Sequence, residues 1–308
     1  MVTSIPPLGD SEKLEFGSNV TTRSSPKAKL VIASYNIRYA RGPHLISGGI
    51  LRKLGRLNHK VRPAIVQRNI KTAARIFSDG NLFPPPDVIA LQEADKRTAR
   101  SGGIHIAKEL ASQLSMTWVH APAGIPRGIK PLPRQWWLDF EEPIELDDEG
   151  DTGVAILSRF PLKEVERIDL PWNECPWRPR LAMSTAIAIG ESELLIFNAH
   201  VDPHAAADGQ LKQLETIGAL ANRSPLPSLI LGDFNTLSTN KCKETRGYLE
   251  SLGFQTVFPT GTPTWRGAGL RLHADWVFSK GVTIERWGVV KPMNVSDHWP
   301  IWVEVSVS

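Results

Sequence analysis

Apolar residues occur along this chain in two alternating patterns. Short, nearly continuous apolar runs are typical of buried strands, and segments with apolar residues three or four apart are typical of helices. The apolar runs predict strands at 29–37, 87–93, 153–162, 181–189, 191–202, 228–235, 272–280, 283–292 and 296–305. The periodic segments predict helices at 63–78, 105–115, 205–221 and 241–252.

Two of these predictions carry local detail. Pro63 suits the first turn of the helix at 63–78, and Asp79-Gly80-Asn81 ends it. The strands 181–189 and 191–202 are separated by hairpin distance, so they are expected to pair antiparallel.

The alternation of strands and helices predicts an α/β fold. So many strands with about four helices pack best as two sheets with the helices outside. The first 28 residues are rich in Ser, Pro and Gly, and a flexible extension is expected at 1–28, followed by a single domain at 29–308.

Composition adds limits to this picture. The chain has 308 residues, 41% of them hydrophobic, which is ample for a buried core. Two cysteines are too few for a disulfide framework or a zinc cluster. No run is long enough to span a membrane and no secretory signal is recognised, so a cytoplasmic protein is expected. A net charge of +4 is compatible with a phosphate-bearing partner without requiring one.

Two irregular segments are left with two readings each. The basic segment from Arg41 to Arg62 is either a loop over a phosphate site or a solvated insertion. Residues 120–152 hold several prolines and an acidic run, and they form either a lid or an irregular surface insertion.

Polar side chains capable of chemistry recur where the predicted strands end. Residues two apart on a strand face the same side, so Asn198 shares a side with His200, and Asp233 with Asn235. A single such residue is more often a turn former. The repetition at several strand ends favours a site, and the further members are Asn36, Glu93, Asp275, Asp297 and His298.

Oxygen ligands without thiolates favour Mg²⁺ or Mn²⁺ over zinc. Carboxylates to activate water, histidines and a divalent metal together suit phosphoester hydrolysis. The sequence contains no G-x-S-x-G elbow for a serine nucleophile, and neither a P-loop nor a dinucleotide-binding fingerprint.

The chain resembles the endonuclease/exonuclease/phosphatase superfamily from about Leu30 to Val305. The blocks that carry the resemblance are SYNIR, LQEAD, GVAILSRFPL, FNAHVD, LGDFN, ADWVF and SDHWP, in this order. The resemblance implies a four-layer α/β sandwich, with two sheets face to face, helices outside and the site at one rim.

The resemblance also implies residue roles. Glu93 would be the chief metal ligand, supported by Asn36 and Asp297. Asp233 would activate the attacking water, and Asn235 would hold the water or the phosphate. The remaining roles fall to the other matched positions: His200 would bind the phosphate, His298 paired with Asp275 would act on the phosphate or as general acid or base, and Asn198 and Arg180 would contact substrate.

Substrate is the least defined expectation. The reaction implied is hydrolysis of phosphodiesters, of nucleic acid or of a small phosphoester. The alternatives are a phosphomonoesterase, a lipid-headgroup phosphodiesterase, or a non-catalytic module that binds a phosphate-bearing partner. Relatives often show Gly-Asn in the block where this chain reads Asp151-Thr152-Gly153-Val154, so the substrate-side asparagine and its usual phosphate contact are not expected.

Overall fold

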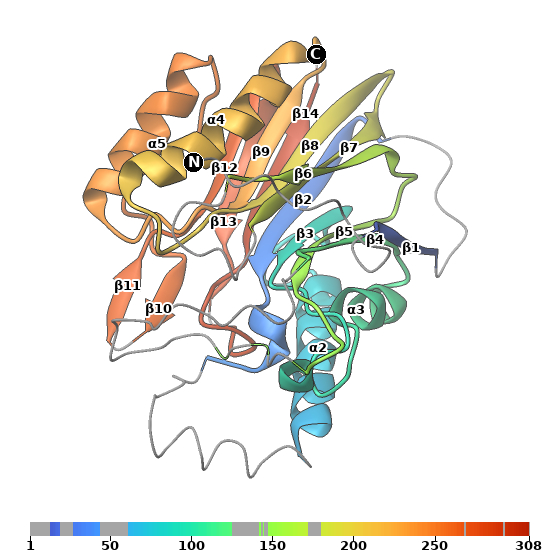
Figure 1. Ribbon diagram of the computed structural model, residues 1–308. Coiled ribbons are helices and arrows are strands. Elements are labelled where there is room, and N and C mark those ends of the chain that lie inside the picture. The colour runs from blue at the N-terminus through green and yellow to red at the C-terminus, as the bar shows by residue number, and fades with distance from the viewer. Residues whose placement is uncertain are drawn as a thin grey trace.

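The computed structural model describes residues 13–18, 27–43, 61–124, 142, 144, 147–171, 180–267, 269–291 and 293–307. Two β-sheets pack face to face, and helices cover the outer face of each (Figure 1). The result is the four-layer α/β sandwich that the sequence predicts.

The larger sheet has seven strands. In spatial order they are β1 (Glu15–Ser18), β4 (Thr117–Pro122), β5 (Gly153–Ser158), β3 (Val88–Gln92), β2 (Lys29–Asn36), β14 (Ile301–Ser306) and β13 (Thr283–Val289). Only β2 and β3 pair in parallel, so both strands end at the same edge of the sheet.

The second sheet has five strands. In spatial order they are β12 (Asp275–Lys280), β9 (Ser228–Asp233), β8 (Ser192–His200), β7 (Leu181–Ile189) and β6 (Lys163–Asp169). β8 and β9 pair in parallel, and the predicted antiparallel pairing of β7 with β8 is confirmed. A short separate hairpin joins β10 (Trp265–Gly267) to β11 (Leu270–Leu272).

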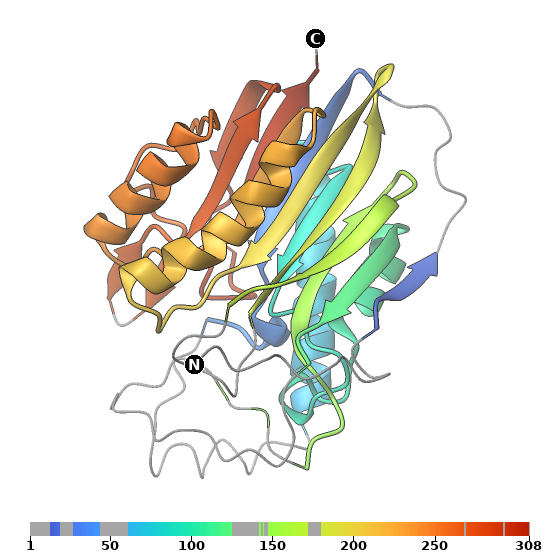
Figure 2. The same cartoon turned by 45° about the horizontal axis from the view of Figure 1, so that its top comes forward.

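Four α-helices complete the outer layers. α2 (Arg62–Asp79) and α3 (Ile106–Leu114) cover the seven-stranded sheet, and α4 (Ala207–Arg223) and α5 (Thr239–Ser251) cover the five-stranded sheet. Figure 2 shows α4 lying along the strands it covers. α2 has Pro63 in its first turn and ends at Gly80, whose φ of 72° suits glycine. Two short 3-10 turns, η2 (Arg38–Ala40) and η3 (Ala99–Ser101), follow strands of the larger sheet.

The core between the sheets follows from the alternation of side chains along each strand. Ile32 and Ile156 of the larger sheet pack in one buried cluster with Ile196 and Leu231 of the smaller. The opposite faces of the same strands pack against the helices, so every central strand is apolar on both sides. Because both faces are buried, the polar strand ends are where these strands can carry chemistry.

Several details differ from the sequence-based expectations. Residues 15–18 lie within the expected extension 1–28, but they form β1 and pair with β4, so this part joins the sheet. β4 extends to Pro122, into the segment expected to be irregular from residue 120. The sequence analysis also missed β4 itself, which is largely buried, and β6, β10 and β11, which are short or polar. Most of the basic segment (44–60), most of 125–146, and Cys175 lie outside the described residues.

No helix in the described ranges is long and apolar enough to cross a membrane.

Candidate active site

The polar strand ends meet at one edge of the sandwich. Asn36 is the last residue of β2 and lies opposite Gln92, the last residue of β3, whose next residue is Glu93. In the other sheet, the final residues of β8 and β9, His200 and Asp233, lie opposite each other. Asp233 also lies opposite Asp275, the first residue of the antiparallel strand β12. The topology therefore brings residues from distant parts of the chain to one rim.

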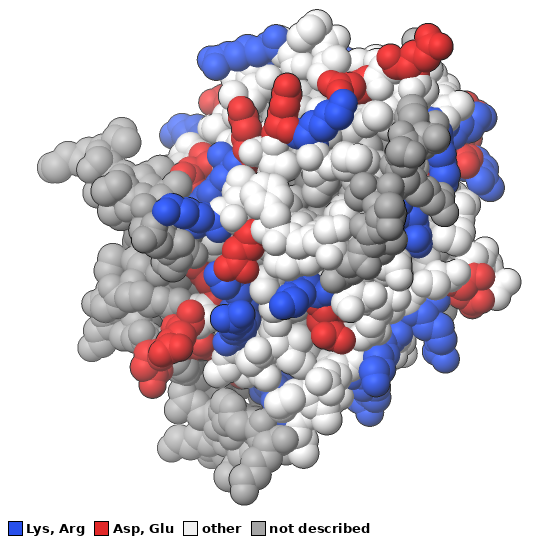
Figure 3. Space-filling view, turned by 90° about the vertical axis from the view of Figure 1, so that its right-hand side faces the viewer, with Lys and Arg blue, Asp and Glu red and all other residues white. Residues whose placement is uncertain are grey.

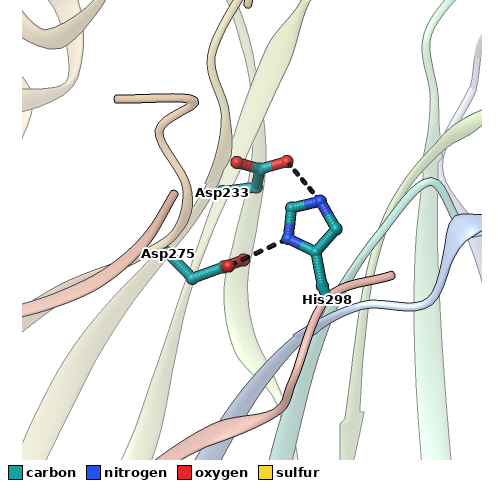
Figure 4. Close-up of side chains that lie close together, drawn as sticks. All are labelled: Asp233, Asp275 and His298. Atoms are coloured by element: carbon teal, nitrogen blue, oxygen red, sulfur yellow. Dashed lines mark hydrogen bonds and ion pairs between the residues drawn. The ribbon is translucent and has the colours of Figure 1, made fainter. Parts of the chain in front are cut away.

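Asp233, Asp275 and His298 form the centre of this rim (Figure 4). His298 Nδ1 lies 2.9 Å from Asp275 Oδ2 and its Nε2 lies 3.7 Å from Asp233 Oδ2. All three side chains are buried. The imidazole thus lies between two carboxylates, and the predicted pairing of His298 with Asp275 is confirmed.

Burial and mutual charge shift the protonation of this group. Burial raises the pKa of Asp233 to about 7, and the negative charge of Asp275 adds to the shift against the opposing effect of His298. Burial disfavours the charged form of His298, but the charges of Asp275 and Asp233 outweigh it and raise its pKa to about 10. His298 is therefore an imidazolium at neutral pH, without a lone pair for a metal.

Gly232 brings β9 close to β8 at this point. Its φ is 140°, and a Cβ there would overlap the carbonyl oxygen of Ala199. A side chain at this position would force the strands apart. Glycine is thus required next to Asp233, within the GDFN block.

Asn36 links the two sheets at the rim. Its Nδ2 donates to Asp233 Oδ2 at 2.8 Å and to Glu93 Oε1 at 3.2 Å. His200 Nε2 lies 3.6 Å from Asp233 Oδ2 and 3.9 Å from Glu93 Oε1. Arg180 Nη1 lies 3.0 Å from either ring nitrogen of His200. These five residues and the Asp275–His298 pair form one continuous polar network.

Asp297 has a different environment from Glu93. Arg38 Nη1 lies 3.2 Å from Asp297 Oδ2, and Trp265 Nε1 donates to the same oxygen at 3.1 Å. Ser296 Oγ donates to Asp297 Oδ1 at 3.2 Å. Arg38 and the two residues after it have φ between 41° and 53°, a left-handed turn that non-glycine residues rarely adopt.

Some of the oxygen atoms at the rim are suitable ligands for a hard divalent cation. Glu93 contributes a carboxylate whose side chain is 12% exposed at the rim. Asn36 offers an amide oxygen, which accepts from the Arg38 N–H at 3.0 Å, so metal ligation by Asn36 stays a prediction. Oxygen donors of this kind suit Mg²⁺ or Mn²⁺. Both carboxylate oxygens of Asp297 already accept hydrogen bonds, so direct metal ligation by Asp297 stays a prediction.

Asn198 and Asn235, which were expected to contact the substrate, the water or the phosphate, form hydrogen bonds with the protein itself. Asn198 is fully buried between the sheets; its Nδ2 donates to the carbonyl oxygens of Leu91 and Ala155, and its Oδ1 accepts from Gln92. Its hydrogen-bonding atoms are used inside the sandwich, and its expected substrate contact stays a prediction.

Asn235 shapes the loop after β9. Its backbone N–H donates to Asp233 Oδ1 at 3.0 Å, and its Nδ2 donates to the carbonyl oxygen of Val201 at 2.9 Å. The residue therefore holds the Asp233 carboxylate in place, and its expected contact with water or phosphate stays a prediction.

Arg38 and Trp265 are the site residues that the sequence analysis missed. Arg38 is two positions after the strand-end Asn36, and a basic residue there is a signal that could have been used. Trp265 reaches the site only through the β10–β11 hairpin, and nothing in its local sequence indicates this. Ser296 shapes the turn before β14, since its Oγ accepts from the His298 N–H.

The face-to-face sheets, outer helices and polar rim define the class of DNase I-like phosphoesterase folds. The model of the Endonuclease/Exonuclease/phosphatase family matches residues 33–298, and the chain belongs to this family. Members of the family are hydrolytic phosphoesterases.

Individual similarities are more distant. The chain is 31% identical to the UPF0294 protein YE0917 of Yersinia enterocolitica over 140 residues, which is 42% of this chain and 53% of that protein. An endonuclease/exonuclease/phosphatase from Beutenbergia cavernae has a TM-score of 0.60 at 16% identity, covering 92% of this chain and 72% of that one. D. rerio TDP2, solved with a single-strand DNA product, has a TM-score of 0.58 at 15% identity, covering 91% and 100%. At these identities the two structures show a shared fold.

Proposed function

We propose that this protein is a divalent-metal-dependent phosphoesterase that hydrolyses phosphodiester bonds by in-line attack of water. The observation that carries the proposal is the position of Asp233 between two histidines. Its Oδ2 lies 3.6 Å from His200 Nε2 and 3.7 Å from His298 Nε2. Its pKa of about 7 suits a base that takes a proton near neutral pH.

In this mechanism Asp233 accepts a proton from the water whose oxygen attacks phosphorus, as the ester P–O bond opposite breaks. Asn36 orients the Asp233 carboxylate through its 2.8 Å hydrogen bond. The His298 imidazolium, charged through Asp275, offsets the negative charge that develops on the phosphoryl oxygens. His200, in contact with Arg180, donates to the same group of oxygens.

Glu93 and Asn36 are the residues that would hold the metal. A divalent cation at this position supplies charge neutralisation at the phosphoryl oxygens and assists their polarisation. The family generally uses divalent metals, and Mg²⁺ or Mn²⁺ is the proposed cofactor here.

A phosphodiester is the proposed substrate class; neighbours of the same fold include both D. rerio TDP2, solved with a single-strand DNA product, and a Bacteroides thetaiotaomicron mannosyl-6-phosphatase. A non-catalytic binding module is disfavoured, since none of the expected catalytic side chains is replaced. Cytoplasmic location stays a prediction.

The test is hydrolysis of bis(4-nitrophenyl) phosphate and plasmid DNA by purified protein with Mg²⁺ or Mn²⁺, and with EDTA. Glu93→Gln and Asp233→Asn are each expected to lower the rate by about 10²- to 10⁴-fold while the fold is kept. Asp208→Asn is the matched control, because this carboxylate is 77% exposed on α4 and its loss is expected to leave the rate unchanged. Full metal-dependent activity in both site variants contradicts the proposal.

Metal binding is measured separately by thermal unfolding. Mg²⁺ or Mn²⁺ binds the folded state and is expected to raise the melting temperature of the wild type. Glu93→Gln is expected to abolish this increase. An equal increase in both proteins would remove Glu93 from the metal site.

A further inference from the structure

A basic groove adjoins the candidate active site. It lies between α2, the β10–β11 hairpin and the segment before Ser296, and its volume is about 800 Å³. Its lining includes Arg68, Asn69, Arg266, Arg271 and Asn294. In Figure 1 the hairpin and α2 both lie toward the lower end of the molecule, where η2 follows β2.

The groove shares two walls with the active site. On one side, Asn69 Nδ2 donates at 2.8 Å to the carbonyl oxygen of Ala40, in the left-handed turn that follows Asn36. On the other side, the Arg266 N–H donates at 2.9 Å to the carbonyl oxygen of Asp297. The groove therefore lies against the turn that follows Asn36 and against the segment that carries Asp297, two segments that also border the candidate active site.

The described lining of the groove is basic. Among the described residues that line it are three arginines and no Asp or Glu. Arg68 and Arg271 are exposed, and within the described ranges neither forms an ion pair with a carboxylate. On the face drawn in Figure 3, by contrast, basic and acidic side chains are intermixed.

Arg266 and Lys291 are held by contacts with uncharged side chains. Arg266 Nη2 donates to Asn294 Oδ1 at 2.6 Å, and its guanidinium lies 5.6 Å from the Trp299 ring. Lys291 Nζ lies 4.4 Å from the same ring. Burial lowers the pKa of Lys291, and the positive charge of Arg271 lowers it further. The lowered pKa of Lys291 indicates repulsion between like charges, which a bound anion would relieve.

We propose that this groove is a subsite for a second phosphate group of the substrate, beyond the phosphate that is hydrolysed. The inference rests on the proposed function, because it assumes that the reacting phosphate lies at Glu93 and Asp233. A volume of about 800 Å³ is far larger than one phosphate needs and is in the range of sites for extended ligands.

Recognition in this groove is by charge and not by stacking. Trp299 is only 5% exposed between Arg266 and Lys291, so it offers no free face to a base. The shared chemistry is thus a multiply phosphorylated molecule, supplied either by a nucleic acid strand or by a small polyphosphorylated compound.

Binding is tested in EDTA, where no hydrolysis occurs. The probe is a short fluorescein-labelled oligothymidylate, followed by fluorescence anisotropy over a range of salt concentrations. Arg68→Gln/Arg271→Gln is expected to bind about tenfold more weakly than the wild type. The slope of log affinity against log salt is expected to fall by about 1.4, since each phosphate contact of a single strand contributes about 0.7.

Arg223→Gln/Lys243→Gln is the control. It removes the same charge from exposed positions on α4 and α5, and it is expected to bind like the wild type. Circular dichroism and melting temperature check that both double variants are folded.

Inositol hexakisphosphate is the second arm. If it binds the wild type, loses affinity in Arg68→Gln/Arg271→Gln, and the oligonucleotide does not bind, the proposal holds with a small polyphosphorylated substrate. Equal affinity of wild type and groove variant, equal losses in the control variant, or no binding of either anion overturns the proposal. Because these measurements exclude catalysis, their failure is separate from a failure to find phosphoesterase activity.

Discussion

His298 Nδ1 lies 2.9 Å from Asp275 Oδ2, with both side chains buried at the rim of the sandwich. The two residues are far enough apart in sequence that only the pairing of β12 with β9 and the turn before β14 bring them together. This contact fixes the orientation of the ring and supports its positive charge.

Asp275→Asn is expected to lower the pKa of His298 below its wild-type value of about 10, because a neutral amide no longer stabilises the imidazolium. The measurement is an NMR titration of the His298 ring in metal-free protein. Glu109→Gln, on the surface of α3, is expected to leave the titration unchanged.

The same shift has a consequence for stability. A pKa raised from 6.5 to about 10 stabilises the fold fully below pH 6.5, and this contribution is lost as the pH rises through about 10. The free energy of unfolding of wild type and Asp275→Asn, measured in urea, is therefore expected to converge from pH 6.5 toward pH 10. A constant difference would contradict the assignment of the shift to this pair.

The protonation of Asp233 is expected to determine how kcat/KM falls at low pH. Its pKa of about 7 means that the carboxylate form, the proposed base, increases as the pH rises through about 7. The value of kcat/KM is expected to rise over that range and then level off. A bound cation favours the carboxylate, so higher metal concentrations are expected to move the limb to lower pH.

Asp233→Asn removes this limb along with most of the rate. The raised pKa also implies that Asp233 contributes stability that is full below pH 3.8 and is lost as the pH rises through about 7. Asp233→Asn should therefore be more stable than the wild type at pH 8 in metal-free protein. A variant less stable than the wild type at that pH would contradict the raised pKa of Asp233.

Asn198→Ala tests the structural role of the buried amide. The substitution leaves the carbonyl oxygens of Leu91 and Ala155 without their donor, and we expect a loss of about 3 kcal/mol in the free energy of unfolding. Asn222→Ala, at an exposed position on α4, is expected to stay within about 0.5 kcal/mol. Urea unfolding monitored by tryptophan fluorescence measures both; a stable but inactive Asn198→Ala would return the residue to the substrate side.

Arg38→Met tests the pair with Asp297. Both side chains are almost fully buried, at 3% and 8% exposure, so loss of the cation leaves a buried carboxylate and is expected to cost about 3–5 kcal/mol. Arg246→Met removes one partner of an exposed pair on α5, with an expected loss of about 0.5 kcal/mol.

A double-mutant cycle completes this test. Arg38→Met/Asp297→Asn is expected to be more stable than Arg38→Met alone, because the uncompensated charge is then removed. Additive losses would show that the two residues do not interact.

The fold class was accessible from the sequence because the apolar runs and helical stripes are local signals. The run at 228–235 and the stripe Ile70, Ala74 and Phe77 are examples, and both elements form where predicted. β6 and β10 were missed because they are short or carry polar residues at edges and in a small hairpin, where burial does not impose an apolar pattern.

The sequence also predicted part of the candidate site. A strand that ends in a polar residue is visible in sequence, so Asn36, Glu93, His200 and Asp233 were identified. The role of Asn198 was not, since alternation along β8 places it on the same side as His200 but does not tell how deep between the sheets it lies. The Arg38–Asp297 pair was also not predicted, because it requires a left-handed turn that no apolar pattern encodes.

The sequence by itself determined the elements, the apolar surfaces they bury and the residue types available for chemistry, because these depend on neighbours along the chain. Only the tertiary structure decided which carboxylate faces which histidine, how far burial shifts their protonation, and that a groove lined by three arginines lies beside them. These properties depend on distance and solvent exclusion between segments far apart in sequence, set by the pairing of strands and the packing of the two sheets.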